Sequence, residues 1–174
     1  LDTGTWLRVF KQAADMGADF ILFGDDYAST DGPMMSPDHF CRFFLPGLCT
    51  VVQAAKDAGV RVIKHTCGQV TPLLDMIVDT GIDALHPLDA AAGMDMAAVK
   101  AKYGDRIAVC GGIDCGDVLS HWTPEQVEAE AQRRLEELMP GGGYILCSSN
   151  SIHSAVKPEN YKAMLDALRR YGTY

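Results

Sequence analysis

Short runs of hydrophobic residues alternate along the chain with longer segments in which hydrophobic positions recur every three or four residues. The short runs have the length and the Val, Ile, Leu and Phe content of strands, and they lie at 20–23, 60–63, 84–86, 107–110 and 144–147. The longer segments predict helices at 4–16, 37–58, 70–80, 94–103, 123–139 and 158–171. A glycine that favours a left-handed cap follows four of these helices: Gly17, Gly59, Gly81 and Gly104.

This order of elements predicts an α/β fold. Strands that are hydrophobic almost throughout and alternate with helices are typical of a parallel sheet covered by helices. Polar residues follow every predicted strand, which favours a (β/α)8 TIM barrel, whose active sites occupy that rim, over an open sheet, which binds ligands at one switch point. Because five βα units do not close a barrel of eight, we expect residues 1–174 to be a single domain forming the C-terminal portion of a barrel.

The segment His65-Thr66-Cys67-Gly68 directly follows the second predicted strand. In extended chain, residues two apart point the same way, so the imidazole of His65 and the thiol of Cys67 are expected to converge. Nitrogen and sulfur donors suit Zn²⁺, and a catalytic zinc site has three protein ligands, for which Cys147 at the end of the last strand is the candidate third. The alternative is that Cys67 packs as a small hydrophobic residue and His65 forms a structural hydrogen bond.

Other strand ends carry further candidates. Asp25 and Asp26 follow the first strand, so one is expected to face the barrel mouth as an acid, a base or a cation partner. The remaining rim residues are candidates for contacting a small-molecule substrate or completing the site: His86, Gly112, Asp114, Ser149 and Asn150. The Gly111-Gly112 pair offers backbone that a ligand can approach closely, whereas His86 as a lone histidine also fits a structural hydrogen bond.

Composition and charge narrow the class of protein. The net charge of −8 and the lack of a Lys/Arg cluster argue against nucleic acid as a partner. Six cysteines in a chain without a signal-peptide pattern or a long hydrophobic run predict reduced thiols in the cytoplasm and no membrane segment. The composition is that of a globular enzyme or ligand-binding domain.

Together these motifs resemble the C-terminal part of the uroporphyrinogen decarboxylase superfamily, a (β/α)8-barrel group that includes corrinoid-dependent methyltransferases. The resemblance covers nearly the whole chain, and the segments that carry it are Gly24-Asp25-Asp26, Ser36-Pro37, His65-x-Cys67-Gly68, Gly111-Gly112-Ile113-Asp114, Gly141-Gly142-Gly143-Tyr144-Ile145-Leu146 and Pro158-Glu159-Asn160. In the methyltransferases, a His-x-Cys pair and a later cysteine bind zinc. The family pattern places that later cysteine at Asn150, three residues after Cys147.

The resemblance implies three functional alternatives. The first is methyl transfer, with methylcobalamin carried by a partner corrinoid protein, zinc at His65 and Cys67, and Asp25 or Asp26 positioning the substrate. The second is decarboxylation of a porphyrinogen, which needs no cofactor, although the decarboxylases lack the His-x-Cys pair and carry a histidine at the position of Asn150. The third is an inactive partial barrel that assembles with its remaining portion or as a homo-oligomer, because exposed sheet edges need covering.

Overall fold

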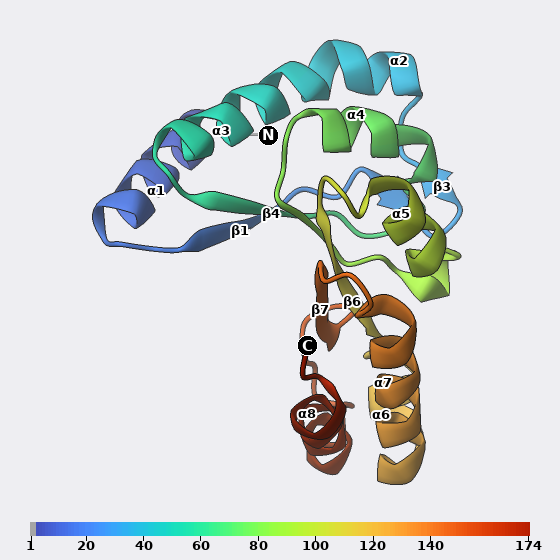
Figure 1. Ribbon diagram of the computed structural model, residues 1–174. Coiled ribbons are helices and arrows are strands. Elements are labelled where there is room, and N and C mark those ends of the chain that lie inside the picture. Colours follow the sequence, from blue (N-terminus) through green and yellow to red (C-terminus); the bar gives the residue numbers. More distant parts are fainter. Residues whose placement is uncertain (1–2) are drawn as a thin grey trace. The chain divides into compact units, whose positions relative to one another are not determined.

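The computed structural model describes residues 3–174, which form two compact units, one ending at His86 and the other spanning Pro87–Tyr174 (Figure 1). The first unit contains α1 (Thr3–Asp15), β1 (Phe20–Gly24), β2 (Ala28–Ser29), β3 (Gly32–Pro33), α2 (Pro37–His39), η1 (Phe40–Phe44), α3 (Leu45–Asp57), β4 (Arg61–His65), η2 (Thr71–Leu73), α4 (Leu74–Asp79) and β5 (Ala84–His86). The second contains η3 (Ala90–Ala92), α5 (Met96–Tyr103), β6 (Ala108–Ile113), α6 (Val118–His121), α7 (Pro124–Leu138), β7 (Tyr144–Ser148) and α8 (Pro158–Tyr171).

All five predicted strands are present, and the predicted α/β class is confirmed. In the first unit β4 pairs in parallel with β1 on one side and β5 on the other. In the second unit β6 pairs in parallel with β7. The structure adds one short antiparallel pair, β2 with β3, which has only two residues in each strand and therefore no hydrophobic periodicity to reveal it.

Helices cover the first ladder on the side of its buried side chains. In β1 the buried residues Ile21 and Phe23 alternate with exposed ones, as a half-buried strand requires. Phe23 packs against Trp6 and Phe10 of α1, with ring centroids 5.3 and 5.5 Å away. Helix α1 in turn lies along α3 (Figure 1). This aromatic cluster fixes the strand whose end carries Asp25 and Asp26.

The single helix predicted over 37–58 is instead three continuous segments, α2, η1 and α3. Its start agrees with the sequence signal, because the Ser36 side chain accepts a hydrogen bond from the His39 amide ahead of Pro37. The π-helical turn η1 arises where Leu45 donates its amide to Phe40 five residues back. Pro46 follows directly, and since it has no amide hydrogen and crowds the preceding turn, it favours this local widening.

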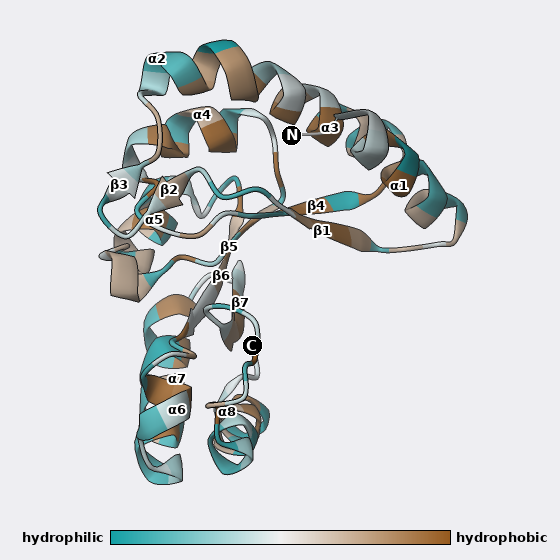
Figure 2. Cartoon of the chain, turned by 180° about the vertical axis from the view of Figure 1, so that it is seen from behind, coloured by the Kyte–Doolittle hydropathy of each residue, from teal (hydrophilic) through white to brown (hydrophobic). Residues whose placement is uncertain are grey.

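In the second unit α7 and α8 pack side by side over a core that includes Val127, Ala131, Met164 and Ala167. Hydrophilic and hydrophobic residues alternate along both helices, as Figure 2 shows. Helix α7 begins with a capping box between Thr123 and Gln126. No helix within residues 3–174 combines the length and the hydrophobicity needed to cross a bilayer.

Three of the four predicted cap glycines are left-handed, with φ of 80° at Gly17, 75° at Gly59 and 86° at Gly81. The prediction for Gly104 is wrong, because its φ is −67°. Its amide continues the helical pattern by donating to the Lys100 carbonyl. The chain then closes a further turn through Arg106, so no left-handed residue is needed there.

Candidate metal centre at the strand ends

The register of the first ladder brings three strand ends into line. Gly24 of β1 lies opposite His65 of β4, and His65 lies opposite His86 of β5. Parallel strands direct their carboxyl ends to the same edge, so the residues that follow β1 and β4 meet there. This edge gathers Asp26, His65, Cys67 and His86, which are separated by up to 60 positions in the sequence.

His65, Cys67 and Asp26 converge on one point. Each offers a donor atom, and these atoms all lie within 4.8 Å of one another. The His65 Nε2 atom is 3.2 Å from the Cys67 sulfur and 3.7 Å from the Asp26 carboxylate. The Cys67 amide also donates to the Asp26 Oδ1 atom at 2.8 Å, which fixes the carboxylate beside the thiol. The structure thus places His65 and Cys67 together as the spacing predicted, and adds Asp26 to them.

The two consecutive aspartates face different surroundings, as alternation along an extended chain predicts. Asp26 is exposed and its carboxylate reaches the His65–Cys67 pair. The Oδ2 atom of Asp25 is buried and has no hydrogen-bond partner. Among the two candidates, Asp26 is therefore the one available to a ligand at this edge.

His86 contacts the other side of the His65 ring. The Nδ1 atoms of the two imidazoles lie 2.8 Å apart, and the ring planes are inclined by 35°. This contact follows from the register, because His65 and His86 are opposite each other on adjacent strands. Sequence reasoning proposed a substrate contact or a structural hydrogen bond for His86, and the structure shows a hydrogen bond to His65.

Lys64 is the residue of this region that sequence reasoning missed. Its side chain is fully buried and donates to the main-chain carbonyls of Asp25 at 2.9 Å and His65 at 2.5 Å. Burial lowers the pKa of Lys64 to about 7, although Asp25 and Asp26 oppose that lowering. The available signal was alternation in β4, where Lys64 shares a face with the buried Val62.

Burial also governs the charge on His65. It lowers the pKa of His65, Asp26 opposes the lowering, and Lys64 adds to it. A lowered pKa favours the neutral imidazole, which is the form that can bind a metal ion through a nitrogen lone pair.

Gly68 allows the chain to leave the site beneath the β2–β3 hairpin. Its φ is +84°, and a Cβ atom at this position would lie 2.5 Å from the Ser29 carbonyl oxygen. The next amide, of Gln69, donates to that same oxygen at 2.8 Å. Any side chain at position 68 would therefore push the hairpin away from the loop that carries Cys67.

In the second unit, the candidates Asp114 and Ser149 interact with each other and with the loop before α6. The Asp114 carboxylate accepts hydrogen bonds from the amides of Gly116 and Asp117, and the Ser149 hydroxyl donates to it at 3.2 Å. The Cys115 amide donates to the Ser149 hydroxyl. These contacts shape the ends of β6 and β7, and a substrate role for either residue stays a prediction.

Cys147 in β7 and Asn150, which follows the strand, differ in exposure. Cys147 is half-buried and lies opposite Gly112, and burial raises the pKa of its thiol to about 11 while a backbone hydrogen bond from Gly111 opposes the rise. Asn150 is exposed, and its side-chain oxygen accepts from the Ser151 amide. Metal binding by Cys147 and a catalytic role for Asn150 stay predictions.

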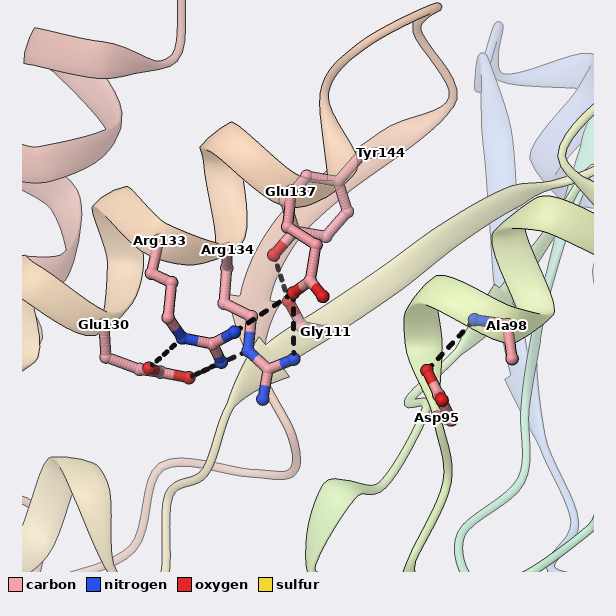
Figure 3. A network of polar contacts seen from close by, with 8 residues as sticks. All are labelled: Asp95, Ala98, Gly111, Glu130, Arg133, Arg134, Glu137 and Tyr144. Atoms are coloured by element: carbon pink, nitrogen blue, oxygen red, sulfur yellow. Dashed lines mark hydrogen bonds and ion pairs between the residues drawn. The ribbon is translucent and has the colours of Figure 1, made fainter.

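Gly112 has a packing reason for lacking a side chain. Its φ is +105°, and a Cβ atom there would lie 2.7 Å from the Tyr144 hydroxyl. That hydroxyl donates to the Gly111 carbonyl at 3.0 Å, beside the ion pairs that Arg134 forms with Glu130 and Glu137 (Figure 3). This packing explains the glycine without a ligand, and the approach of a ligand to Gly112 stays a prediction.

A family model described as uroporphyrinogen decarboxylase matches residues 3–171, nearly the whole chain. The chain belongs to the uroporphyrinogen decarboxylase family. This confirms the family that the sequence resemblance implied.

Curated relatives in this family carry the decarboxylase name. The chain is 29% identical over 168 residues to uroporphyrinogen decarboxylase from Pelodictyon phaeoclathratiforme, covering 92% of this chain and 44% of that protein. It is 37% identical over 162 residues to the uroporphyrinogen decarboxylase of Psychromonas ingrahamii, covering 87% and 41%. The chain thus spans less than half the length of these relatives.

Among solved structures, a methyltransferase from Methanosarcina mazei matches with a TM-score of 0.81 and 25% identity, over 98% of this chain and 48% of that one. A dihydropteroate synthase from Anaplasma phagocytophilum matches with a TM-score of 0.64 and 17% identity, covering 98% and 71%, which shows a shared fold only. The chain is therefore similar both to curated proteins named as decarboxylases and to a solved structure named as a methyltransferase.

Proposed function

We propose that this chain supplies the thiol-activating site of a corrinoid-dependent methyltransferase within the uroporphyrinogen decarboxylase superfamily, with zinc held by His65, Cys67 and Asp26. The observation that carries the proposal is the convergence of these three donor atoms within 4.8 Å. The likeness to a methyltransferase structure over 98% of the chain supports it.

The three residues fit a zinc ion in donor type. Imidazole nitrogen, thiolate sulfur and carboxylate oxygen are the donors that zinc takes in proteins. Ligands about 2.0–2.3 Å from a tetrahedral zinc ion lie roughly 3.3–3.7 Å from one another. The distances from His65 Nε2 to the Cys67 sulfur and the Asp26 oxygen, 3.2 and 3.7 Å, need only small adjustments to reach that geometry.

Three protein donors leave one position of a tetrahedral site for a substrate, the arrangement typical of catalytic zinc. Bound there, the ion would supply the positive charge that lowers the pKa of a substrate thiol. His65, which would bind through Nε2, is half-buried, whereas Asp26 is exposed and would leave its side of the site open to a substrate. Cys147, in the second unit, stays an alternative third ligand.

The proposal implies two partners and a cellular compartment. A small-molecule thiol would accept the methyl group, and a separate corrinoid protein carrying methylcobalamin would donate it. Because the site needs a reduced Cys67, the proposed setting is the cytoplasm.

The second candidate is decarboxylation of a porphyrinogen. It is favoured by the names of the curated relatives, which are 29% and 37% identical to this chain. Under this alternative no metal is needed, and Asp26, the aspartate available to a ligand, would stabilise positive charge on the substrate. His65 would then contact the substrate instead of a metal ion.

Metal content of the purified protein tests the first proposal against the second. We expect about one zinc ion per chain, loss of the metal in Cys67→Ser, and weaker retention in Asp26→Asn, because an amide oxygen is a poorer ligand than a carboxylate. Cys41→Ser is the matched control, since Cys41 is an exposed cysteine in η1. Elemental analysis after dialysis against a weak chelator gives the readout.

The absence of zinc from the wild-type protein, even after incubation with the metal, would contradict the proposal and favour the decarboxylase alternative. Zinc that persists in Cys67→Ser and Asp26→Asn would contradict this assignment of ligands.

A further inference from the structure

A polar contact between the side chains of β4 and β5 at the candidate site joins two histidine rings. The Nδ1 atoms of His65 and His86 are 2.8 Å apart, which is a hydrogen-bond distance. One proton must lie between these atoms, because two would repel and none would leave two lone pairs facing each other. The protonation of the two rings is therefore linked.

Either His65 Nδ1 donates this hydrogen to His86, or His86 Nδ1 donates it to His65. The contacts at the opposite edge of the His65 ring decide between these two arrangements. Its Nε2 atom faces the Cys67 sulfur at 3.2 Å and Asp26 at 3.7 Å. To bind a cation between these donors, Nε2 must present a lone pair, so the ring hydrogen of neutral His65 lies on Nδ1. His86 Nδ1 is then the acceptor, and neutral His86 carries its own hydrogen on Nε2.

We infer that His86 is a positioning residue that holds His65 in the tautomer and orientation required to bind metal. The inference builds on the proposed zinc site, but the tautomer it assigns is a property of the protein itself. In known metal sites a histidine ligand donates its second ring hydrogen to an acceptor in this way, and loss of that acceptor weakens metal binding by about 10–100-fold.

Parallel register makes this role possible. His65 and His86 are directly opposite on β4 and β5, so the acceptor is fixed by main-chain hydrogen bonds and not by a flexible loop. The amide of Thr66, next to His65, donates to the His86 carbonyl at 2.9 Å and closes the ladder at this point. The contact between the two rings is thus supported by main-chain hydrogen bonds between the strands that carry them.

Two variants of His86 distinguish the effect of the hydrogen-bond acceptor on zinc affinity from the effect of losing the imidazole ring. His86→Asn keeps an acceptor oxygen near the position of Nδ1, whereas His86→Leu has no acceptor. We expect His86→Leu to lower zinc affinity by about 10–100-fold and His86→Asn to stay within about threefold of wild type. His39→Leu is the control, since His39 is exposed in α2. Competition with a chromophoric chelator measures the affinities.

Nitrogen-15 NMR of the imidazoles in metal-free protein gives a readout that does not depend on zinc. We expect His65 to be protonated on Nδ1 and His86 on Nε2. The reverse assignment would overturn the inference, as would equal zinc affinities in His86→Leu, His86→Asn and wild type, or equal losses in both variants. If wild-type protein binds no zinc, the proposed function fails while the tautomer measurement still decides the inference.

Discussion

Lys64 shows how one buried charge can shape the strand ends that carry the candidate site. Its ammonium group bonds the carbonyls of Asp25 and His65, which directly precede Asp26 and Thr66, and lies 4.4 Å from the centre of the Tyr27 ring. Burial lowers the pKa of Lys64 to about 7 and outweighs the charges of Asp25 and Asp26, which favour the protonated form. Lys64 therefore links β1 to β4, and the free-energy cost of burying its positive charge depends on pH.

This cost predicts a pH dependence of stability. The unfolded chain keeps the Lys64 proton up to about pH 10.5, whereas the folded protein releases it near pH 7. Between these values the unfolded state binds more protons, so the free energy of unfolding contributed by Lys64 rises with pH, by on the order of 1 kcal/mol per pH unit.

Lys64→Met isolates this contribution, because its side chain fills similar space without a charge. Urea denaturation of metal-free protein at pH 7, 8 and 9 should show that the wild type gains stability relative to the variant as the pH rises. Parallel curves for the two proteins would contradict the lowered pKa. Loss of the Lys64 hydrogen bonds to the carbonyls of Asp25 and His65 adds a cost to the variant that does not change with pH.

At the scale of elements, the sequence pattern was informative wherever a segment was long enough to be periodic. It located five strands and the convergence of His65 with Cys67, because spacing of two is a local property. It left open which of Asp25 and Asp26 faces the site, because that depends on the twist of the chain after β1. The His65–His86 contact depends on the register between β4 and β5, which no local pattern contains.

Asn160 illustrates an interaction between elements that also needed the structure. It lies in the first turn of α8, is fully buried, and donates its side-chain amide to the carbonyls of Leu119 and Trp122 at 3.1 and 2.9 Å. These carbonyls lie at the end of α6, whose last turn has no continuing helix to satisfy them. Asn160 thus joins α6 to α8 in the second unit.

Asn160→Asp should destabilise the protein by about 3 kcal/mol or more, because it removes the donor and places a carboxylate against carbonyl oxygens in a buried site. Glu159→Gln, at the exposed neighbouring position, should change stability by less than about 0.5 kcal/mol. Urea denaturation of both variants at pH 7 measures the difference. Equal stabilities would show that Asn160 does not carry the connection between α6 and α8.

At the scale of the whole molecule, the hydrophobic side chains of β1 are only partly buried. Ile21 and Phe23 are buried, but Phe20 and Leu22 on the other face of the strand are 56% and 49% exposed. In a (β/α)8 barrel, side chains that point away from the helices fill the interior in packed layers. Since the chain spans less than half the length of its curated relatives, we propose that the remaining part of a barrel, or a second copy, covers these residues.

This proposal predicts that the 174-residue chain self-associates through the exposed face of β1. In the part of the chain that the structure describes, β1 pairs only with β4, so its outer edge also offers unpaired backbone groups to a neighbour. Light scattering should give a mass above the 18.8 kDa of one chain, and the mass should rise with concentration. Phe20→Ser combined with Leu22→Ser should lower it by removing apolar surface.

Met16→Ser is the matched control, since Met16 is exposed but lies before β1 and outside its face. A separately produced N-terminal portion of a family barrel should compete with self-association and give a particle containing one copy of each, because it restores both the strand pairing and the interior layers. A particle of one chain at every concentration would contradict the proposal. Such a result would mean that Phe20 and Leu22 tolerate water, as isolated exposed hydrophobic residues do on many proteins.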